Sequence, residues 1–396
     1  MIIELPEWGA VSGLELDQNQ VAALAGTDAF TLRPDQAAAQ RWQLSASQFV
    51  GVAHVGDLQI RVTPKVPVHR LLELLCISQD RIRWDDRNTL WEESDDLFAT
   101  VARSFVTQAE RVLQRGLVQG YVTIDESMFG IRGRVAISRQ LARNPGLPLP
   151  VEVTYDDYTV DVVENQLLAG AGRLLLRLKT LPASIASRLR RLEYLLLDVT
   201  PTSPSSSPPK ITWTRLNQRY QPAVTLAHLI LRSAALEFDG EHSTIGDAFL
   251  VDMNKVFEDV VGLGIRRALQ PEGLKVELQR HDHLDHLGHV EIRPDVLVSA
   301  GLKPVAVADV KYKRPATSGL STGDLYQAVA YATRYGLDRC TLVYAEPPLV
   351  SELHVGDITL RLTSIDLATT PDVRSGAIDA LSRQLAEPHQ HIAWSA

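Results

Sequence analysis

The chain has 396 residues, of which 45% are hydrophobic and 22% charged, and its formal net charge is −8 at pH 7. This composition is typical of a soluble globular protein with room for two or three domains. It excludes a membrane-spanning protein, because no apolar run approaches the roughly 18 residues needed to cross a bilayer.

The N-terminus carries no signal peptide, so we expect a cytoplasmic protein without membrane contact. Cys76 and Cys340 are the two cysteines, and they lie far apart in apolar surroundings. A disulfide framework or a zinc ribbon is therefore excluded.

The first part of the chain, residues 1–165, is predicted to be rich in β-strands. Alternating apolar runs at 49–55 and 58–66 are joined through Gly56-Asp57, a pair that is typical of a hairpin turn. Residues 90–117 follow a helical period. Further strands are predicted over 121–124, 131–137 and 151–160, with a turn at Gly130 between the first two.

The middle part, residues 166–245, is predicted to be mainly helical, with a loop at 200–210 whose serines and prolines cannot pack a core. From residue 246 onward the pattern predicts a mixed sheet flanked by helices. Its strands are expected over 274–279, 290–298, 339–344 and 357–362, and its later helices over 321–335 and 371–386. The fold class that follows is α+β.

The segments Arg293-Pro294-Asp295 and Asp309-Val310-Lys311 carry the most informative polar residues. Both lie in short apolar, β-branched runs that predict neighbouring strands, joined by a glycine- and proline-containing turn at 300–304. Alternation places Asp309 and Lys311 on one face, and a hairpin can bring Asp295 to that face. Two carboxylates and an ammonium could then hold Mg²⁺ and orient a water for phosphodiester hydrolysis, although a structural salt bridge would also explain them.

With aspartate at the middle acidic position, this arrangement resembles the PD-(D/E)xK nuclease superfamily. Members of that superfamily often carry an acidic residue on the helix before the core sheet, which points here to Glu258 as a further metal ligand. The pair Gln327 and Tyr331 resembles the Q-x-x-x-Y helix signature of RecB-type members, where it lies beside DNA. Glu258 on a solvated helix face is the alternative reading of that residue.

Four ordered blocks give a second resemblance, to the McrC family, the nuclease subunit of modification-dependent restriction systems. They are V-G-V…I-R-V-T-P-K-V (50–66), G-L-V-Q-G-Y…I-R-G-R-V (116–135), Y-D-D-Y-T-V-D-V-V-E-N-Q-L-L (155–168) and T-R-L-N-Q-R-Y-Q-P-A-V (214–224). The likeness covers about residues 45–345. It implies a partner, the McrB-like AAA+ GTPase ring, which the N-terminal region would bind and stimulate, and a double-stranded DNA substrate that carries a base modification.

This division of labour fits the acidic charge, because a protein that captures DNA alone normally has a basic surface. No Walker A pattern occurs in the chain, so GTP binding is expected of the partner. Arg132 and Arg134 are candidates for stimulating the GTPase.

The resemblance implies a Mg²⁺ site, with Mn²⁺ as a substitute, formed by Asp295, Asp309, Glu258 and the backbone carbonyl of Val310. Lys311 would orient or deprotonate the attacking water. Lys313 and Arg314 could contact phosphates, and exposure to solvent is the alternative for both.

Three alternatives remain open at this point. The chain could be a stand-alone repair or resolvase-type nuclease, or a non-catalytic activator of an AAA+ motor. The histidines between residues 281 and 289 could bind zinc, but no cysteine accompanies them and an exposed turn is expected there.

Overall fold

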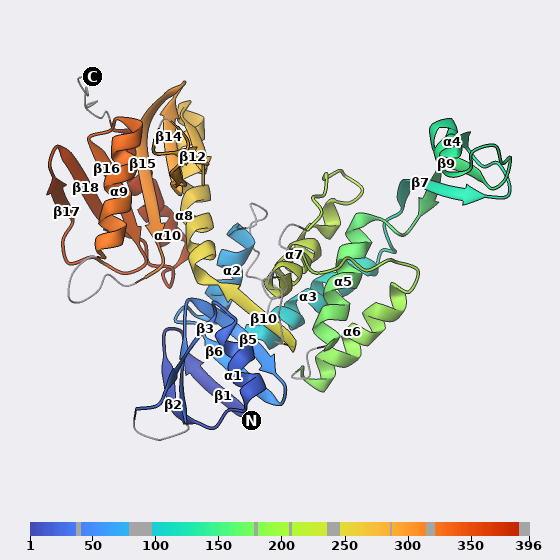
Figure 1. The fold of residues 1–396 in the computed structure, drawn as a ribbon, viewed down its shortest axis with the longest axis horizontal. Helices are drawn as coiled ribbons and strands as arrows, with labels where there is room; N and C mark the ends of the chain where they lie inside the picture. Colours follow the sequence, from blue (N-terminus) through green and yellow to red (C-terminus); the bar gives the residue numbers. More distant parts are fainter. Residues whose placement is uncertain are drawn as a thin grey trace. The chain divides into compact units, whose positions relative to one another are not determined.

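The structure is a computed structural model that describes residues 1–36, 41–78, 97–177, 181–205, 208–235, 246–285, 287–313 and 321–387. The chain forms two compact units, one of residues 1–93, 244–246 and 250–396 and the other of residues 94–243 and 247–249. Figure 1 labels their elements, which combine helices with several sheets, as the α+β class requires.

This division differs from the three consecutive parts predicted from the sequence. The N-terminal strands and the C-terminal sheet fall in one unit, while the segment after residue 93 falls in the other. Compactness does not reveal which part faces a partner, so that assignment stays a prediction.

The N-terminal strands of the first unit form two sheets. The predicted hairpin is confirmed as β5 (Phe49–Val55) and β6 (Leu58–Thr63), which pair antiparallel around Gly56 at φ 62°. Strand β1 (Ile2–Pro6) pairs parallel with β6, and β10 (Gly246–Asp252) lies beside β5. The smaller sheet contains β2 (Ala10–Leu14), β3 (Phe30–Pro34) and β4 (Trp42–Ala46). Two helices accompany these sheets, α1 (Gln18–Ala25) and α2 (Val68–Ser78).

The C-terminal part of this unit is a six-stranded mixed sheet in the order β11-β14-β15-β16-β18-β17. Its strands are β11 (Lys275–Leu278), β14 (Val296–Ala300), β15 (Lys303–Lys311), β16 (Arg339–Tyr344), β17 (Glu352–Val355) and β18 (Ile358–Ser364). Strands β15, β16 and β18 run parallel, whereas β14 pairs antiparallel with β15. Most strands and helices predicted for this region are confirmed, and β17 was not predicted. The strand predicted over 290–298 is wrong as a single strand: it is divided into β13 (Glu291–Ile292), which pairs with β12 (Asp282–His283), and β14 of the six-stranded sheet.

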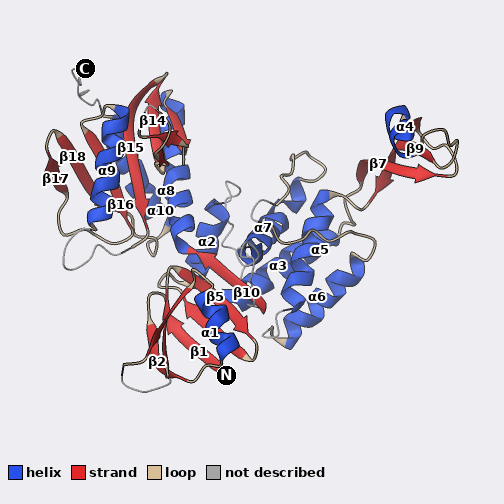
Figure 2. Ribbon diagram, viewed as in Figure 1, coloured by secondary structure: helices blue, strands red, loops and turns tan. Residues whose placement is uncertain are grey.

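Helices α8 (Met253–Leu269), α9 (Thr322–Tyr335) and α10 (Pro371–Ala386) flank this sheet (Figure 2). Helix α9 packs Ala328, Tyr331 and Ala332 against Leu297 and Val307 of the sheet, among other buried residues. Because side chains alternate along a strand, residues two positions away from Leu297 and Val307 lie on the face that α9 covers. Asp295 and Asp309 are those residues.

The second unit contains a helical bundle of α3 (Leu97–Leu113), α5 (Val163–Arg177), α6 (Ala183–Leu195) and α7 (Gln221–Ala235). A β-ribbon, called here the β7–β9 arm (residues 120–159), pairs β7 (Gly120–Met128) with β9 (Val151–Thr159) along their whole length. No helix among the described residues is long and apolar enough to span a membrane.

One strand prediction in the arm is wrong. Residues 131–137 contain only the short β8 (Arg134–Val135), and helix α4 (Ile137–Arg143) begins where a strand was expected to end. Strand β7 pairs with β9 instead of turning back at Gly130. Partner choice between strands is a tertiary effect that local alternation does not encode.

Candidate active site at the end of strand β15

The register of the β14–β15 hairpin brings two aspartates together. Val296 pairs with Ala308, so the next position along the ladder sets Asp295 opposite Asp309. The register shifts between Val298 and Ser299, where β15 contains one additional residue. Without this bulge Asp295 would face Ala308, and Asp309 would lie on the other side of the sheet.

Asp309 is almost completely buried yet incompletely paired. Its side chain is 1% exposed, and Lys311 Nζ lies 2.6 Å from its Oδ2 atom. Both oxygens are buried without a satisfied hydrogen bond among the described residues; Oδ2 has the Lys311 ion pair, and the Asp295 carboxyl group is a close neighbour. Asp295 is better satisfied, because its Oδ2 atom accepts a 2.7 Å hydrogen bond from the Val310 backbone N–H.

Burial makes the negative charges of this cluster costly. It raises the pKa of Asp309 to about 7, and the neighbouring Asp295 contributes in the same direction. Burial likewise raises the pKa of Asp295, with a further contribution from Glu258. Burial alone would lower the pKa of Lys311, but ion pairing with Asp309 and Asp295 outweighs it and the pKa is raised.

Glu258, predicted as a further ligand, lies near this cluster on helix α8. Burial raises its pKa to about 7, and the charges of Lys311 and Asp309 also act on it. Its Oε2 atom accepts a 2.7 Å hydrogen bond from Gln279 Nε2. The cluster thus contains Glu258, Asp295, Asp309 and Lys311, the four residues predicted to be catalytic. The contact between Glu258 and Gln279 was not predicted.

Gln327 and Tyr331 make an internal contact. Gln327 donates to the Tyr331 hydroxyl at 2.7 Å, and that hydroxyl donates to the Arg293 carbonyl at 3.1 Å. Tyr331 is 2% exposed. The pair therefore anchors the segment that carries Asp295, and its predicted proximity to DNA stays a prediction.

Lys313 has a partner within the chain. Its ammonium lies 2.7 Å from Asp324 Oδ2, near the start of helix α9. Arg314 lies outside the described residues. A role for either residue in phosphate binding stays a prediction.

The donor set fits a hard divalent cation. Within the part of the chain that the structure describes, no three acidic, imidazole or thiol groups gather into a complete cation site. Mg²⁺ does not require one, since it is usually held by one or two carboxylates and retains several waters. The undonated Oδ1 atom of Asp309 beside Asp295 supplies such oxygens. The expected contribution of the Val310 carbonyl stays a prediction.

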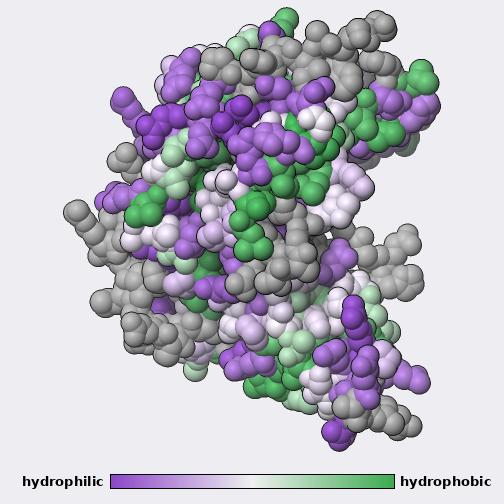
Figure 3. All heavy atoms as spheres, turned by 90° about the vertical axis from the view of Figure 1, so that its left-hand side faces the viewer, coloured by the Kyte–Doolittle hydropathy of each residue, from purple (hydrophilic) through white to green (hydrophobic). Residues whose placement is uncertain are grey.

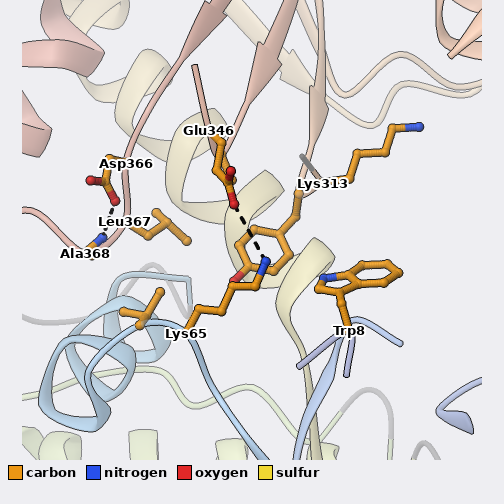
Figure 4. A pocket seen from close by; sticks show the side chains of 10 residues that line it. Trp8, Lys65, Lys313, Glu346, Asp366, Leu367 and Ala368 are labelled. Atoms are coloured by element: carbon orange, nitrogen blue, oxygen red, sulfur yellow. Dashed lines mark hydrogen bonds and ion pairs between the residues drawn. The ribbon is translucent and has the colours of Figure 1, made fainter. Parts of the chain in front are cut away.

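A pocket lies just beyond the ends of β15, β16 and β18, and it is lined by Trp8, Lys65, Lys313, Glu346 and Asp366, among others, but by none of the four cluster residues (Figure 4). Its charges are paired, since Lys65 lies 3.6 Å from Glu346 and Asp366 accepts a hydrogen bond from the Ala368 backbone at 2.8 Å. It therefore presents no group of unopposed cations to a phosphate.

The face drawn in Figure 3 intermixes hydrophilic and hydrophobic residues and does not by itself mark a binding surface.

The two arginines predicted to stimulate a GTPase lie on the β7–β9 arm, in the second unit. Arg132 is ion-paired with Asp157 at 2.6 Å and stacks over the Tyr155 ring at 4.1 Å. Arg134 is exposed on β8. Neither belongs to the aspartate cluster.

Two histidines of the 281–289 segment make exposed carboxylate contacts: His281 lies 2.6 Å from Glu291, and His289 lies 3.2 Å from Asp285. His283 lies in the short strand β12, which pairs antiparallel with β13. His286 lies outside the described residues. The segment is therefore partly strand, and the expected exposed turn is confined to the residues between β12 and β13.

The chain was compared with protein-family models, curated proteins and solved structures. A family model described as McrBC 5-methylcytosine restriction system component matches residues 44–345. No curated protein matches the chain.

Two solved structures are similar to it. One is a chain of the refined half-complex from a tetradecameric assembly of Thermococcus gammatolerans McrB AAA+ hexamers with bound McrC, at a TM-score of 0.60 and 18% identity, with 97% of this chain and 100% of that chain covered. The other is a chain of the Thermococcus gammatolerans McrBC complex, at a TM-score of 0.42 and 20% identity, with 68% and 88% covered. At such identity the first likeness shows a shared fold.

Proposed function

The chain belongs to the McrBC 5-methylcytosine restriction system component family, whose model matches most of it, and we propose on this premise that it is the nuclease subunit of a McrBC-like restriction system. In this proposal the C-terminal sheet is a PD-(D/E)xK nuclease core. It hydrolyses phosphodiester bonds of modified double-stranded DNA with Mg²⁺, or Mn²⁺ in its place.

The observation that carries the proposal is the buried, undonated Oδ1 atom of Asp309 beside the Asp295 carboxyl group. Burying a charge without full pairing costs several kcal/mol. The ion pair with Lys311 engages Oδ2, and the other close neighbour of Asp309, the Asp295 carboxyl group, adds a second negative charge rather than a cationic partner. A bound cation accounts for both carboxylates, because it replaces the missing donor.

Each residue of the cluster has a distinct role in this proposal. Asp295 and Asp309 would hold the cation, and Glu258 would contact one of its waters; when bound, the cation would supply positive charge to the scissile phosphate and make a water more acidic. Lys311 Nζ lies 2.6 Å from Asp309 Oδ2. From this position Lys311 would orient or deprotonate the attacking water and neutralise the charge that develops on the phosphate.

We also propose an AAA+ GTPase ring as partner, because the similar Thermococcus gammatolerans structure contains McrC with McrB AAA+ hexamers. The β7–β9 arm supports this, since it exposes large apolar side chains: Tyr121 (78%), Phe129 (84%), Ile131 (70%) and Ile137 (68%). Exposed apolar groups of this kind are typical of protein-binding surfaces. Arg132 and Arg134 of the arm are our candidates for stimulating GTP hydrolysis.

The decisive variant is Asp309→Ala, assayed with the partner ring, Mg²⁺, GTP and methylated DNA. Loss of a cation ligand removes several kcal/mol of transition-state stabilisation, so cleavage should fall by about 1,000-fold or more. Partner binding and GTPase stimulation should persist. Asp379→Ala, an exposed aspartate on α10, is the matched control and should cleave normally.

The same assay separates the alternatives. Cleavage by Asp309→Ala at the rate of the unaltered protein would show that this active-site assignment is wrong. Cleavage without partner or GTP would indicate a stand-alone nuclease. GTPase stimulation without any cleavage by the unaltered protein would indicate a non-catalytic activator.

A further inference from the structure

We propose that Gln279, at the end of β11, is a positioning residue that holds the Glu258 carboxylate toward the Asp295–Asp309 pair. The role rests on the proposed nuclease function and adds to it a residue that touches neither the cation nor DNA. No sequence motif marks Gln279, and only its contacts identify it.

Both ends of the Gln279 amide are used. Its Nε2 atom donates to Glu258 Oε2 at 2.7 Å, and its Oε1 atom accepts from Arg293 Nη2 at 2.6 Å. An amide with a donor contact at one end and an acceptor contact at the other cannot turn over without losing both. Gln279 thereby ties the α8 carboxylate to the Arg293-Pro294-Asp295 segment.

The backbone of Gln279 is also tied to that segment. Its N–H donates to the Asp295 carbonyl at 3.0 Å, one step beyond the pairing of Leu278 with Val296. Gln279, Asp295 and Asp309 therefore occupy one row across three strands. Any shift of the strand end moves the Gln279 amide and Asp295 together.

Gln279 adopts a conformation that favours glycine. Its φ is 48°, and among the described residues Trp8 is the other non-glycine residue with a positive φ. A left-handed conformation is costly for a residue with a Cβ atom, and such residues gather at functional sites. Glycine would form the same turn with less strain, so the side chain itself is the reason to place glutamine here.

Gln279 would act on cation binding through the Glu258 carboxylate. This half-buried carboxylate sits among charges that act on it, including Lys311 and Asp309. With one oxygen fixed by the Gln279 donor, the carboxylate has less freedom to lose when a cation binds. Removing the donor should therefore weaken cation binding without disturbing the fold.

Two substitutions test this on the full-length chain. Gln279→Gly removes the amide and relieves the backbone, whereas Gln279→Met keeps the length of the side chain and the strain. Both should lower the affinity for Mn²⁺, measured by calorimetry with the metal alone, roughly 10- to 100-fold. Cleavage with the partner ring should fall by a similar factor. The Tm of Gln279→Gly should stay equal to that of the unaltered protein or rise.

Arg280→Ala is the matched control, because Arg280 follows Gln279 but bonds to Glu277 at 3.1 Å, outside the cluster. It should bind Mn²⁺ and cleave DNA normally. Unchanged Mn²⁺ affinity in both Gln279 variants would overturn the positioning role. So would an affinity loss that appears only in a variant whose Tm has also fallen.

Asp309→Ala separates this result from the parent proposal. If the unaltered protein binds Mn²⁺ in an Asp309-dependent manner and cleaves, an unaffected Gln279 variant overturns the positioning role alone. If the unaltered protein shows no Asp309-dependent Mn²⁺ binding, the nuclease assignment and the positioning role fail together.

Discussion

The aspartate cluster and the β7–β9 arm both contain many charged residues, but these side chains are largely buried in the cluster and mostly exposed in the arm. In the cluster, Asp309 is 1% exposed and one of its oxygens has no donor among the described residues. In the arm, most charges pair in solvent: Arg132 is 53% exposed and lies 2.6 Å from Asp157. The buried Glu152 is the exception, and it has Arg143 at 3.4 Å as a partner.

This difference separates a site in which buried carboxylate oxygens lack hydrogen-bond donors from a surface whose charged groups pair mostly with one another in solvent. Exposed ion pairs contribute about 0–1 kcal/mol, so those of the arm cost the fold little whether or not they have a function. A buried carboxylate that lacks a donor costs several kcal/mol, and its persistence calls for a ligand. Substitutions that remove a buried or an exposed charge should therefore change the free energy of unfolding by different amounts.

The largest effect on stability is expected where a buried charge is fully paired. Glu73 forms a close ion pair with Arg374, whose side chain is 3% exposed, and Arg70 lies 3.0 Å from Glu73 as well. Glu73→Gln would leave the Arg374 guanidinium buried without its partner, so the free energy of unfolding should fall by about 3–5 kcal/mol. Urea denaturation measures this value. A loss below about 1 kcal/mol would show that buried pairs of this protein behave like surface pairs.

Asp309→Asn should raise the free energy of unfolding of the metal-free protein, whereas Glu73→Gln should lower it. Because burial and Asp295 raise the pKa of Asp309 from 3.8 to about 7, the folded state disfavours the ionised form. Asparagine keeps the shape without the charge, so at about pH 8 the free energy of unfolding should rise by about 1 kcal/mol or more, given ~1.4 kcal/mol for each pKa unit.

The pH dependence of that gain provides its control. A folded-state pKa above the unfolded one means that the stability contribution of Asp309 is complete below about pH 4 and is lost as the pH rises toward 7. The advantage of asparagine should therefore shrink between about pH 8 and pH 5. An Asp309→Asn variant less stable than the unaltered protein at about pH 8 would contradict the unfavourable burial inferred here.

The smallest effect on stability is expected in the arm. Replacing Arg132 and Arg134 together by alanine should change the free energy of unfolding by less than about 1 kcal/mol. If the arm contacts the partner as proposed, stimulated GTP hydrolysis should still fall about tenfold, the effect of losing one good interface contact. Arg41→Ala, another exposed arginine with an ion pair, is the control. If the double variant stimulated GTP hydrolysis as strongly as the Arg41→Ala control, Arg132 and Arg134 would have no part in the stimulation.

The sequence predicted the part of the site that depends on local pattern. Alternation along one strand placed Asp309 and Lys311 on a common face, and the turn residues at 300–304 predicted the hairpin that brings Asp295 alongside. The bulge that sets the register was not predictable, because it depends on how the β14–β15 pair fits the whole sheet.

Contacts between distant segments also lay beyond the sequence. Gln279 and Glu258 are 21 positions apart on a strand end and a helix, and no spacing rule links such elements. The hydrogen bond from the Tyr331 hydroxyl to the Arg293 carbonyl was not predicted either, and the proximity of Tyr331 to DNA stays a prediction. Motif resemblance located that residue near the site, but its orientation is set by packing against the sheet.

Crystals of this chain grown with Mn²⁺ would show whether Asp295 and Asp309 together hold a divalent cation. We predict an anomalous-scattering peak within about 2.5 Å of a carboxylate oxygen from each aspartate. A peak at the histidines of the 281–289 segment with none between the two aspartates would show that the cation site lies elsewhere.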